Sequence, residues 1–287
     1  MEMRLLSSWF NVDKRDPCSY KFVVEDITEI NQPNLADPDD PILDGFANSL
    51  LTAHADPVMI REECNILLED LDNLNLSIIK NYIEEQVLPV SASGVRGVAR
   101  IGNFGEILSS YLLMTFQGFS LPIYKLRYRE KQSWAMKLTD LCLINRDESL
   151  SKPLVCYGEV KTKSAKNCDT NIGIEGHDSL IKDDALEDPE ILKFFCTILY
   201  SSQQYEEADF FSRLRLGKIE YEKQYNLFLV HEKTTWRDEI LDKLDAHPLD
   251  GRLANFCVSV VLIQQLREVI DESYTRAWKG VEAILNG

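Results

Sequence analysis

The feature that most constrains the fold is an alternation of apolar, β-prone runs with segments of helical periodicity, which begins near residue 98 and continues to the end of the chain. The β-prone runs are residues 122–128, 136–145, 154–161, 225–231 and 256–263, and the helical segments are residues 98–116, 180–215, 236–244 and 264–285. Strands and helices that alternate in this way bury their apolar faces by packing helices onto a sheet. The sequence therefore predicts an α/β fold with a mixed sheet flanked by helices.

The residues before this alternation have a different pattern. They are irregular and acidic at first and become helical later. The elements that we expect are a strand at 20–27, a loop at 32–44, a helix at 58–88 and a small, flexible linker at 90–97. We therefore predict an acidic N-terminal region at residues 1–90, α/β or helical in structure, and a second domain at residues 91–287.

The composition is that of a globular protein. Of the 287 residues, 45% are hydrophobic and 27% are charged, which excludes disordered and collagen-like chains. No apolar run approaches the roughly 18 residues of a membrane span, and the N-terminus lacks the apolar segment of a secretory signal. The seven cysteines are scattered without a CxxC pair, which indicates buried thiols in a reducing cytoplasm. They are Cys18, Cys64, Cys142, Cys156, Cys168, Cys196 and Cys257.

The net charge of −16 argues against a free-standing nucleic-acid-binding protein. The charge is unevenly distributed, however. Residues 1–90 carry 6 basic and 18 acidic side chains, whereas residues 125–166 carry 10 basic and 5 acidic side chains. One central stretch is therefore basic within an acidic chain. A chance local variation in charge on a solvated face explains this basic stretch as well as a binding surface does.

Two of the predicted strands carry charged side chains in apolar surroundings. Asp140 lies in residues 138–145 (LTDLCLIN), and Glu159 and Lys161 lie near the end of residues 154–161 (LVCYGEVK). Side chains alternate along a strand, so Glu159 and Lys161 share one face, about 7 Å apart. A carboxylate inside a buried strand costs on the order of several kcal/mol unless it is paired or binds a metal. If the two strands pair, Asp140 and Glu159 form a site for Mg²⁺, which prefers carboxylate oxygens.

Each of these residues also has an ordinary explanation. Asp140 alone fits an edge strand or a turn, and Glu159 with Lys161 fits a solvent-facing pair. Glu106 lies off the apolar stripe of its predicted helix and fits a surface glutamate. The order of the residues is more informative than any one of them, because an aspartate is followed after 18 residues by E-x-K, and a helix with a glutamate precedes both.

This order resembles the PD-(D/E)XK nuclease superfamily, which places a glutamate on a helix before the sheet, as in residues 102–110 (GNFGEILSS) here. The helix at 100–106, the TDLCLI strand and the CYGEVKTK strand together resemble a narrower family, HamA of the Hachiman anti-phage defence system. This resemblance covers most of residues 91–287 and implies a restriction-endonuclease-like fold. The catalytic residues that it implies are Asp140, Glu159, Lys161 and Glu106.

The resemblance further implies a DNA nuclease that depends on Mg²⁺, or on Mn²⁺ in its place, and that a superfamily 2 helicase subunit, HamB, holds in check. Asp140 and Glu159 would hold one or two ions with the Val160 carbonyl and Glu106, and Lys161 would position water or stabilise negative charge. We expect little sequence preference, since the contacts to nucleic acid would be to phosphates. The candidate phosphate contacts are Arg127, Arg129, Lys163 and Lys166.

Three functions stay open at this point. The first is this metal-dependent DNA nuclease, in the cytoplasm and without a membrane anchor, with residues 1–90 as the docking surface for the helicase. The second is a non-catalytic interaction subunit with a nuclease-like fold, and the third is another restriction or repair nuclease of the superfamily. The four histidines have no metal-binding spacing, and residues 173–176 (GIEG) indicate only a turn.

Overall fold

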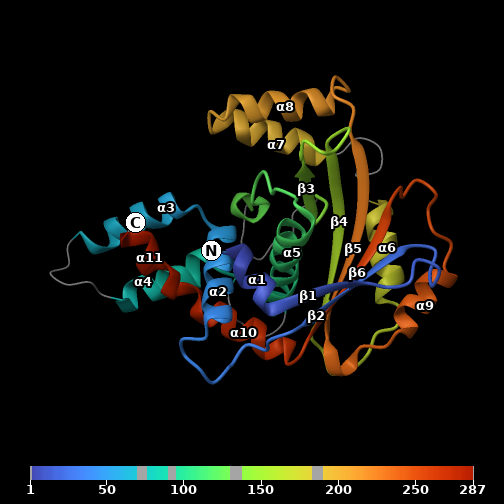
Figure 1. Cartoon of the computed structure of the whole chain (residues 1–287). Coiled ribbons are helices and arrows are strands. Elements are labelled where there is room, and N and C mark those ends of the chain that lie inside the picture. Colours follow the sequence, from blue (N-terminus) through green and yellow to red (C-terminus); the bar gives the residue numbers. More distant parts are fainter. Residues whose placement is uncertain (1, 70–75, 90–94, 130–137, 183–189, 287) are drawn as a thin grey trace.

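The computed structural model describes residues 2–69, 76–89, 95–129, 138–182 and 190–286. At its centre lies a six-stranded sheet in the order β1-β2-β6-β5-β4-β3 (Figure 1). The strands are β1 (Phe10–Lys14), β2 (Val23–Glu29), β3 (Leu141–Asn145), β4 (Leu154–Lys163), β5 (Glu222–Glu232) and β6 (Phe256–Ile263). The four inner strands are parallel, and β1 and β3 are antiparallel at the two edges. The predicted mixed sheet is thus confirmed and is compatible with a nuclease-like α/β fold.

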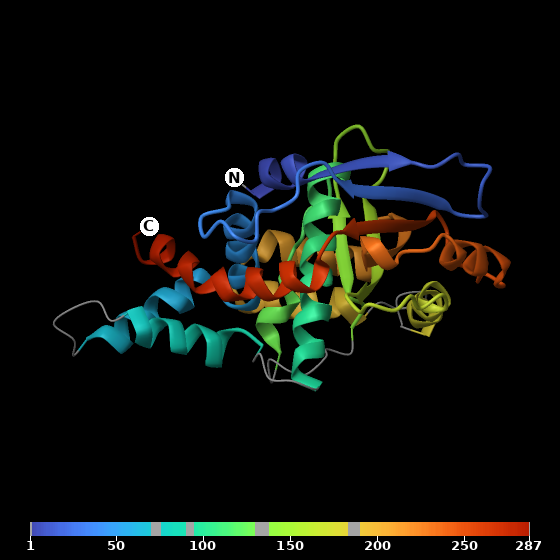
Figure 2. The same cartoon turned by 90° about the horizontal axis from the view of Figure 1, so that it is seen from below.

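Helices cover both faces of this sheet. The helices of the described residues are α1 (Glu2–Trp9), α2 (Pro41–His54), α3 (Pro57–Leu68), α4 (Leu76–Tyr82), α5 (Val95–Gln117), α6 (Ile172–Lys182), α7 (Glu190–Ser201), α8 (Tyr205–Arg215), α9 (Glu239–Ala246), α10 (Leu266–Arg276) and α11 (Gly280–Asn286). Short π or 3₁₀ turns are η1 (Ile83–Val87), η2 (Lys125–Tyr128), η4 (Lys233–Thr235) and η5 (Ala277–Lys279). Helix α5 lies on one face, and α6 and α9 lie on the other (Figures 1 and 2).

Strand β4 shows why both faces are covered. Its side chains alternate between two hydrophobic clusters: Cys156 and Val160 belong to the cluster beneath α5, and Val155 and Tyr157 belong to the cluster beneath α6. A strand that is apolar on both faces needs a helix on each of them. The charged residues of β4 therefore lie between two packed layers.

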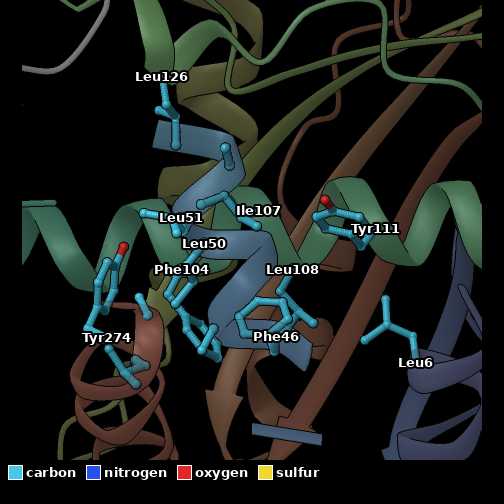
Figure 3. Packing of buried hydrophobic residues seen from close by; sticks show 14 of the residues in the cluster. Leu6, Phe46, Leu50, Leu51, Phe104, Ile107, Leu108, Tyr111, Leu126 and Tyr274 are labelled. Carbon is cyan, nitrogen blue, oxygen red and sulfur yellow. The ribbon is translucent and has the colours of Figure 1, made fainter. Parts of the chain in front are cut away.

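The N-terminal region is part of this architecture. Strands β1 and β2 extend the sheet beyond β6, and α2 packs on α5, with the Phe46 ring 5.0 Å from that of Phe104 (Figure 3). The boundary that we predicted at residue 90 falls in residues 90–94, outside the described residues. The described residues on either side of it share one sheet and one hydrophobic cluster.

Several local predictions for this region are wrong. Residues 2–57 are not irregular, because they contain α1, β1, β2 and the whole of α2. The predicted loop at 32–44 ends in the first turn of α2, where Asp40 caps the helix and Pro41 takes a position in which proline needs no donor. The single helix predicted at 58–88 is divided into α3, α4 and η1, and residues 70–75 lie outside the described part.

Three further predictions are also wrong. Residues 122–128 are not a strand, because Lys125–Tyr128 form the 3₁₀ turn η2, in which the Arg127 backbone N–H donates to the Tyr124 carbonyl instead of to a sheet partner. Asp140 does not lie within a strand, because β3 begins at Leu141. The GIEG segment is no turn but lies in α6, where a Cβ on Gly176 would overlap the Leu227 side chain of β5.

Candidate active site

Glu106 lies at a close contact between helix α5 and strand β4. A Cβ on the preceding residue, Gly105, would overlap Thr162 Oγ1 and lie 3.0 Å from Val160 Cγ1, so glycine permits this approach. The Glu106 side chain is 15% exposed, and its carboxylate lies 3.2 Å from Lys125 Nζ and 3.7 Å from Arg129 Nη2. Burial raises the pKa of Glu106; Lys125 opposes this shift, and the nearby Asp140 carboxylate adds to it.

Asp140 lies in the bend that leads into β3. Its Oδ2 accepts a hydrogen bond of 3.0 Å from the Val160 N–H, and its Oδ1 lies 3.8 Å from Lys125 Nζ. The β3–β4 ladder ends at the pair Leu141–Gly158, so no residue of β3 pairs with Val160. The carbonyl of a strand residue points to the same side as its N–H. The Val160 carbonyl therefore faces the same open edge as the Asp140 carboxylate.

Glu159 and Lys161 share one face of β4, as the sequence predicts. Lys161 Nζ lies 2.7 Å from Glu159 Oε1 and donates to Ser179 Oγ of α6 at 3.0 Å. Glu159 is only 7% exposed. This pair faces the α6 layer, whereas α5 with Glu106 covers the opposite face. The Ser179 contact fixes the Lys161 ammonium beside the carboxylate.

The four predicted residues thus form two pairs, Glu106 with Asp140 and Glu159 with Lys161. The first pair shares the Lys125 ammonium. The Val160 amide, which lies between Glu159 and Lys161 in the chain, connects Asp140 to the second pair. A single cleft that holds all four side chains stays a prediction.

Lys125 is the residue that the sequence analysis missed. Its Nζ donates to the Thr139 carbonyl at 2.8 Å in addition to its two carboxylate contacts, and its side chain is 11% exposed. Only the basic character of residues 125–166 pointed to it, because it belongs to no motif. The mistaken strand at 122–128 also hid it, since we expected its neighbours to pair with the sheet.

Arg129, which we predicted to contact phosphate, belongs to the framework instead. Its side chain is 6% exposed, and its Nη1 donates to Asn103 Oδ1 at 2.8 Å. Asn103 Nδ2 in turn donates to His54 Nε2 at 3.0 Å, and His54 Nδ1 donates to the Leu50 carbonyl at 2.7 Å. Helix α2 therefore fixes the position of Arg129, and through it that of Glu106.

A small cavity of about 30 Å³ lies beside Glu106, Lys125 and Asp140. Apolar side chains such as Ile123 and Phe195 form much of its lining. A water molecule needs roughly 10–15 Å³ by this measure, so the cavity has room for about two waters and none for a nucleotide. Any polymeric substrate must reach the carboxylates from outside this cavity.

A second group of possible metal ligands lies between α6 and the turn after α9. His177 Nδ1 and His247 Nε2 lie 3.1 Å and 3.4 Å from Asp178 Oδ1. The sequence analysis missed this cluster because the fold joins two histidines that are distant in the chain. The Asp250 N–H donates to His177 Nε2 at 3.3 Å, so His177 Nδ1 carries the proton and donates it to Asp178. These contacts use both ring nitrogens of His177, and the cluster is a hydrogen-bonded network.

Among the described residues, no helix has both the length and the apolar character needed to cross a membrane.

A search of the curated proteins found no match. The family model described as HamA matches residues 16–277, which is most of the chain. This chain therefore belongs to the HamA family, whose members are subunits of the Hachiman anti-phage defence system.

Proposed function

We propose that this chain is the metal-dependent DNA nuclease of its defence complex, and that it hydrolyses phosphodiester bonds with little sequence preference under the control of a helicase partner. One observation carries the proposal. The carboxylate of Asp140 lies on the open edge of β4 at the backbone between Glu159 and Lys161, and shares a lysine ammonium with Glu106. The carboxylates of Asp140 and Glu106 thus share one positive charge, and the Val160 amide joins Asp140 to the backbone between Glu159 and Lys161.

The residues present fit a divalent cation. Lys125 places one positive charge against both Glu106 and Asp140, which supports a cation site at this pair of carboxylates. All the candidate ligands are oxygens, the donors that Mg²⁺ and Mn²⁺ prefer. The residues that would hold the ion are Asp140, Glu159, Glu106 and, through its carbonyl, Val160. When bound, the ion would polarise the scissile phosphate and lower the pKa of a water molecule.

The side chains of the chain itself would orient the reaction. Lys161, held between Glu159 and Ser179, supplies a fixed positive charge where negative charge develops on the phosphate. Its position is set before substrate arrives, so no reorganisation is needed during the reaction. The buried Arg129 neutralises Glu106 from the side of α2 and keeps that carboxylate in place.

DNA would approach along the carboxyl ends of the parallel strands. Lys163 ends β4, and its Nζ lies 3.4 Å from Asp169. Lys166, Thr234 and Arg267 line an open groove of about 520 Å³ at the ends of β4, β5 and β6, together with the acidic Glu232 and Glu268. Basic and hydroxyl side chains of this kind bind phosphates without reading bases, which is the reason to expect weak sequence preference.

The partner would dock on the N-terminal region. Residues 1–90 have 12 more acidic than basic side chains, from 18 acidic and 6 basic, and such a surface repels DNA. On α3 several apolar side chains are exposed, among them Val58 at 64% and Ile66 at 63%. An apolar patch within an acidic region is typical of a protein-binding surface. We assign this patch to the binding of a superfamily 2 helicase subunit. We place the complex in the cytoplasm, where the free cysteines stay reduced.

Plasmid cleavage tests the proposal. The purified chain, alone and with its helicase, is incubated with supercoiled plasmid and linear DNA in Mg²⁺, in Mn²⁺ and in EDTA. We expect cleavage with either cation, none in EDTA and none with Asp140→Asn. A soluble chain that binds the helicase, protects cells from phage and leaves DNA intact under all these conditions would favour the non-catalytic interaction subunit.

A further inference from the structure

The position of Lys125 affects how a divalent cation would bind to Glu106 and Asp140. Its ammonium is 3.2 Å from Glu106 Oε2 and 3.8 Å from Asp140 Oδ1, two carboxylates that come from different elements. Two like charges at this depth repel each other unless a positive charge lies between them. Lys125 supplies that charge from within the chain.

The lysine is firmly held in this position. The Thr139 carbonyl accepts a hydrogen bond of 2.8 Å from Nζ, and the side chain is 11% exposed. Its own element, η2, is anchored to α2 because Arg127 Nε donates to the Thr52 carbonyl at 2.9 Å. The ammonium is therefore preorganised against the carboxylates and is not a surface charge that happens to lie near them.

We infer that Lys125 is a tethered cation that competes with the divalent metal for Glu106 and Asp140. The inference rests on the proposed function, since it concerns the same carboxylates. A divalent cation and an ammonium that share the same two carboxylates repel each other, so metal binding requires Lys125 to move away. Lys125 is a positioning residue in this scheme: it balances carboxylate charge at the metal-free site and sets the cation concentration at which the site fills.

Mn²⁺ binding, measured by the loss of the free-ion EPR signal, tests this inference without any cleavage assay. Removing the competing charge with Lys125→Met should tighten Mn²⁺ binding by about tenfold or more, given the size of charge–charge interactions at this distance. Asp140→Asn should abolish binding in both backgrounds.

The chain offers a matched control. Lys279 Nζ also contacts two carboxylates, Asp44 at 3.8 Å and Asp39 at 3.9 Å, and donates to the Pro38 carbonyl. Lys279→Met therefore removes a similar lysine from another place and should leave Mn²⁺ affinity unchanged. A gain in both variants would mean that any exposed acidic pair attracts the ion, which overturns a specific role for Lys125.

A second measurement uses the wild-type chain and does not depend on how a variant folds. Lysine acetylation, followed residue by residue by mass spectrometry, should be slow at Lys125 without Mg²⁺ and about tenfold faster with it, while Lys279 reacts equally in both. If Mn²⁺ competes with Mg²⁺ for the protein but Lys125 stays protected, the metal binds without displacing the lysine and the inference is wrong.

The outcomes separate the two proposals. Binding that requires Asp140 but is no tighter in Lys125→Met overturns the inference and leaves the proposed function intact. Tighter binding in Lys125→Met, with no DNA cleavage by any variant, supports the inference and contradicts the nuclease. If neither the wild type nor Lys125→Met binds Mn²⁺, both are wrong, because the carboxylates then hold no metal even without their competitor.

Discussion

The Glu159–Lys161 pair has a large part in the proposed chemistry and contributes little to the stability of the fold. Its members contact each other at 2.7 Å, and Lys161 reaches one serine on α6. Removing only one of them would leave a buried charge unpaired, which is costly, whereas removing both avoids this. The pair can therefore be tested by a double substitution that keeps the fold.

The double variant Glu159→Ala/Lys161→Ala should lower DNA cleavage by at least about 100-fold, because both the cation ligand and the fixed positive charge are lost. Its melting temperature and its binding to the helicase should change little. Lys152→Ala/Glu220→Ala is the matched control, since it removes an exposed pair at 2.6 Å on the surface. Cleavage by the first double variant at the rate of this control would remove the catalytic assignment.

His54 makes stability depend on pH. Burial lowers the pKa of His54 from 6.5 to about 4, and the neutral ring is needed because Nε2 accepts a hydrogen bond from Asn103. As pH falls below 6.5 the unfolded chain takes up a proton that the folded chain accepts only near pH 4. The free energy of unfolding should therefore decrease across this window, by up to about 3 kcal/mol from this group.

Urea unfolding between pH 7 and pH 4.5 measures this effect. Subtracting the curve of His54→Gln from that of the wild type isolates the contribution of His54 from that of other titrating groups. The difference should be largest at neutral pH and should shrink as the pH falls. A difference that is constant over the whole range would show that His54 titrates at its ordinary value.

At the scale of elements, the close contact between α5 and β4 positions Glu106. Gly105→Ala should displace the helix, because the new Cβ would overlap Thr162 Oγ1. We expect a loss of about 1–3 kcal/mol in stability, as for other overpacked sites, together with reduced cation binding. Gly102→Ala in the same helix is the control: nothing lies within 4 Å of its Cβ, so it should stabilise the helix by up to about 1 kcal/mol.

The variant Thr162→Ala tests whether the contact with Thr162 Oγ1 causes the stability loss expected for Gly105→Ala. It removes the overlapping oxygen, so Gly105→Ala/Thr162→Ala should recover much of the lost stability. If Gly105→Ala and Gly102→Ala behave alike in thermal unfolding, the helix does not depend on this close approach and Glu106 is positioned in some other way.

The elements that sequence predicts well are those decided by local pattern. Strands β4, β5 and β6 follow from continuous apolar runs, and α5 follows from its helical periodicity, with ends that differ by a few residues. Residues 122–128 could not be predicted, because contacts of Arg127 and Lys125 with other elements decide their conformation. For the same reason the E-x-K motif was visible in the sequence but Lys125 was not.

At the scale of the whole molecule, residues 1–90 both support and flank the site. Helix α2 holds Arg129 through His54 and Asn103, and β2 pairs with β6. Deleting these residues would unfold the sheet edge and the cluster under α5, so deletion cannot test partner docking. A pattern analysis divides the chain where composition changes, and it does not detect strands that return to a distant sheet.

Substitutions on the surface of α3 test docking instead. Val58 and Ile66 are eight residues apart and lie on one exposed helix face. Val58→Asp/Ile66→Asp should leave the melting temperature unchanged and weaken helicase binding by about tenfold or more. Leu216→Asp, at a position 61% exposed at the end of α8, is the control. Equal helicase affinity in all three proteins would place the docking surface elsewhere.

The central claim is that one divalent cation joins Asp140 to Glu159 at the edge of β4. A crystal of the chain grown with Mn²⁺, measured near the manganese absorption edge, tests it directly. We expect an anomalous peak about 2 Å from oxygens of Asp140, Glu159 and the Val160 carbonyl, with Lys125 Nζ moved away from Glu106. A peak at His177 and His247 instead, or carboxylates of Asp140 and Glu159 more than about 10 Å apart with no ion between them, would contradict the account.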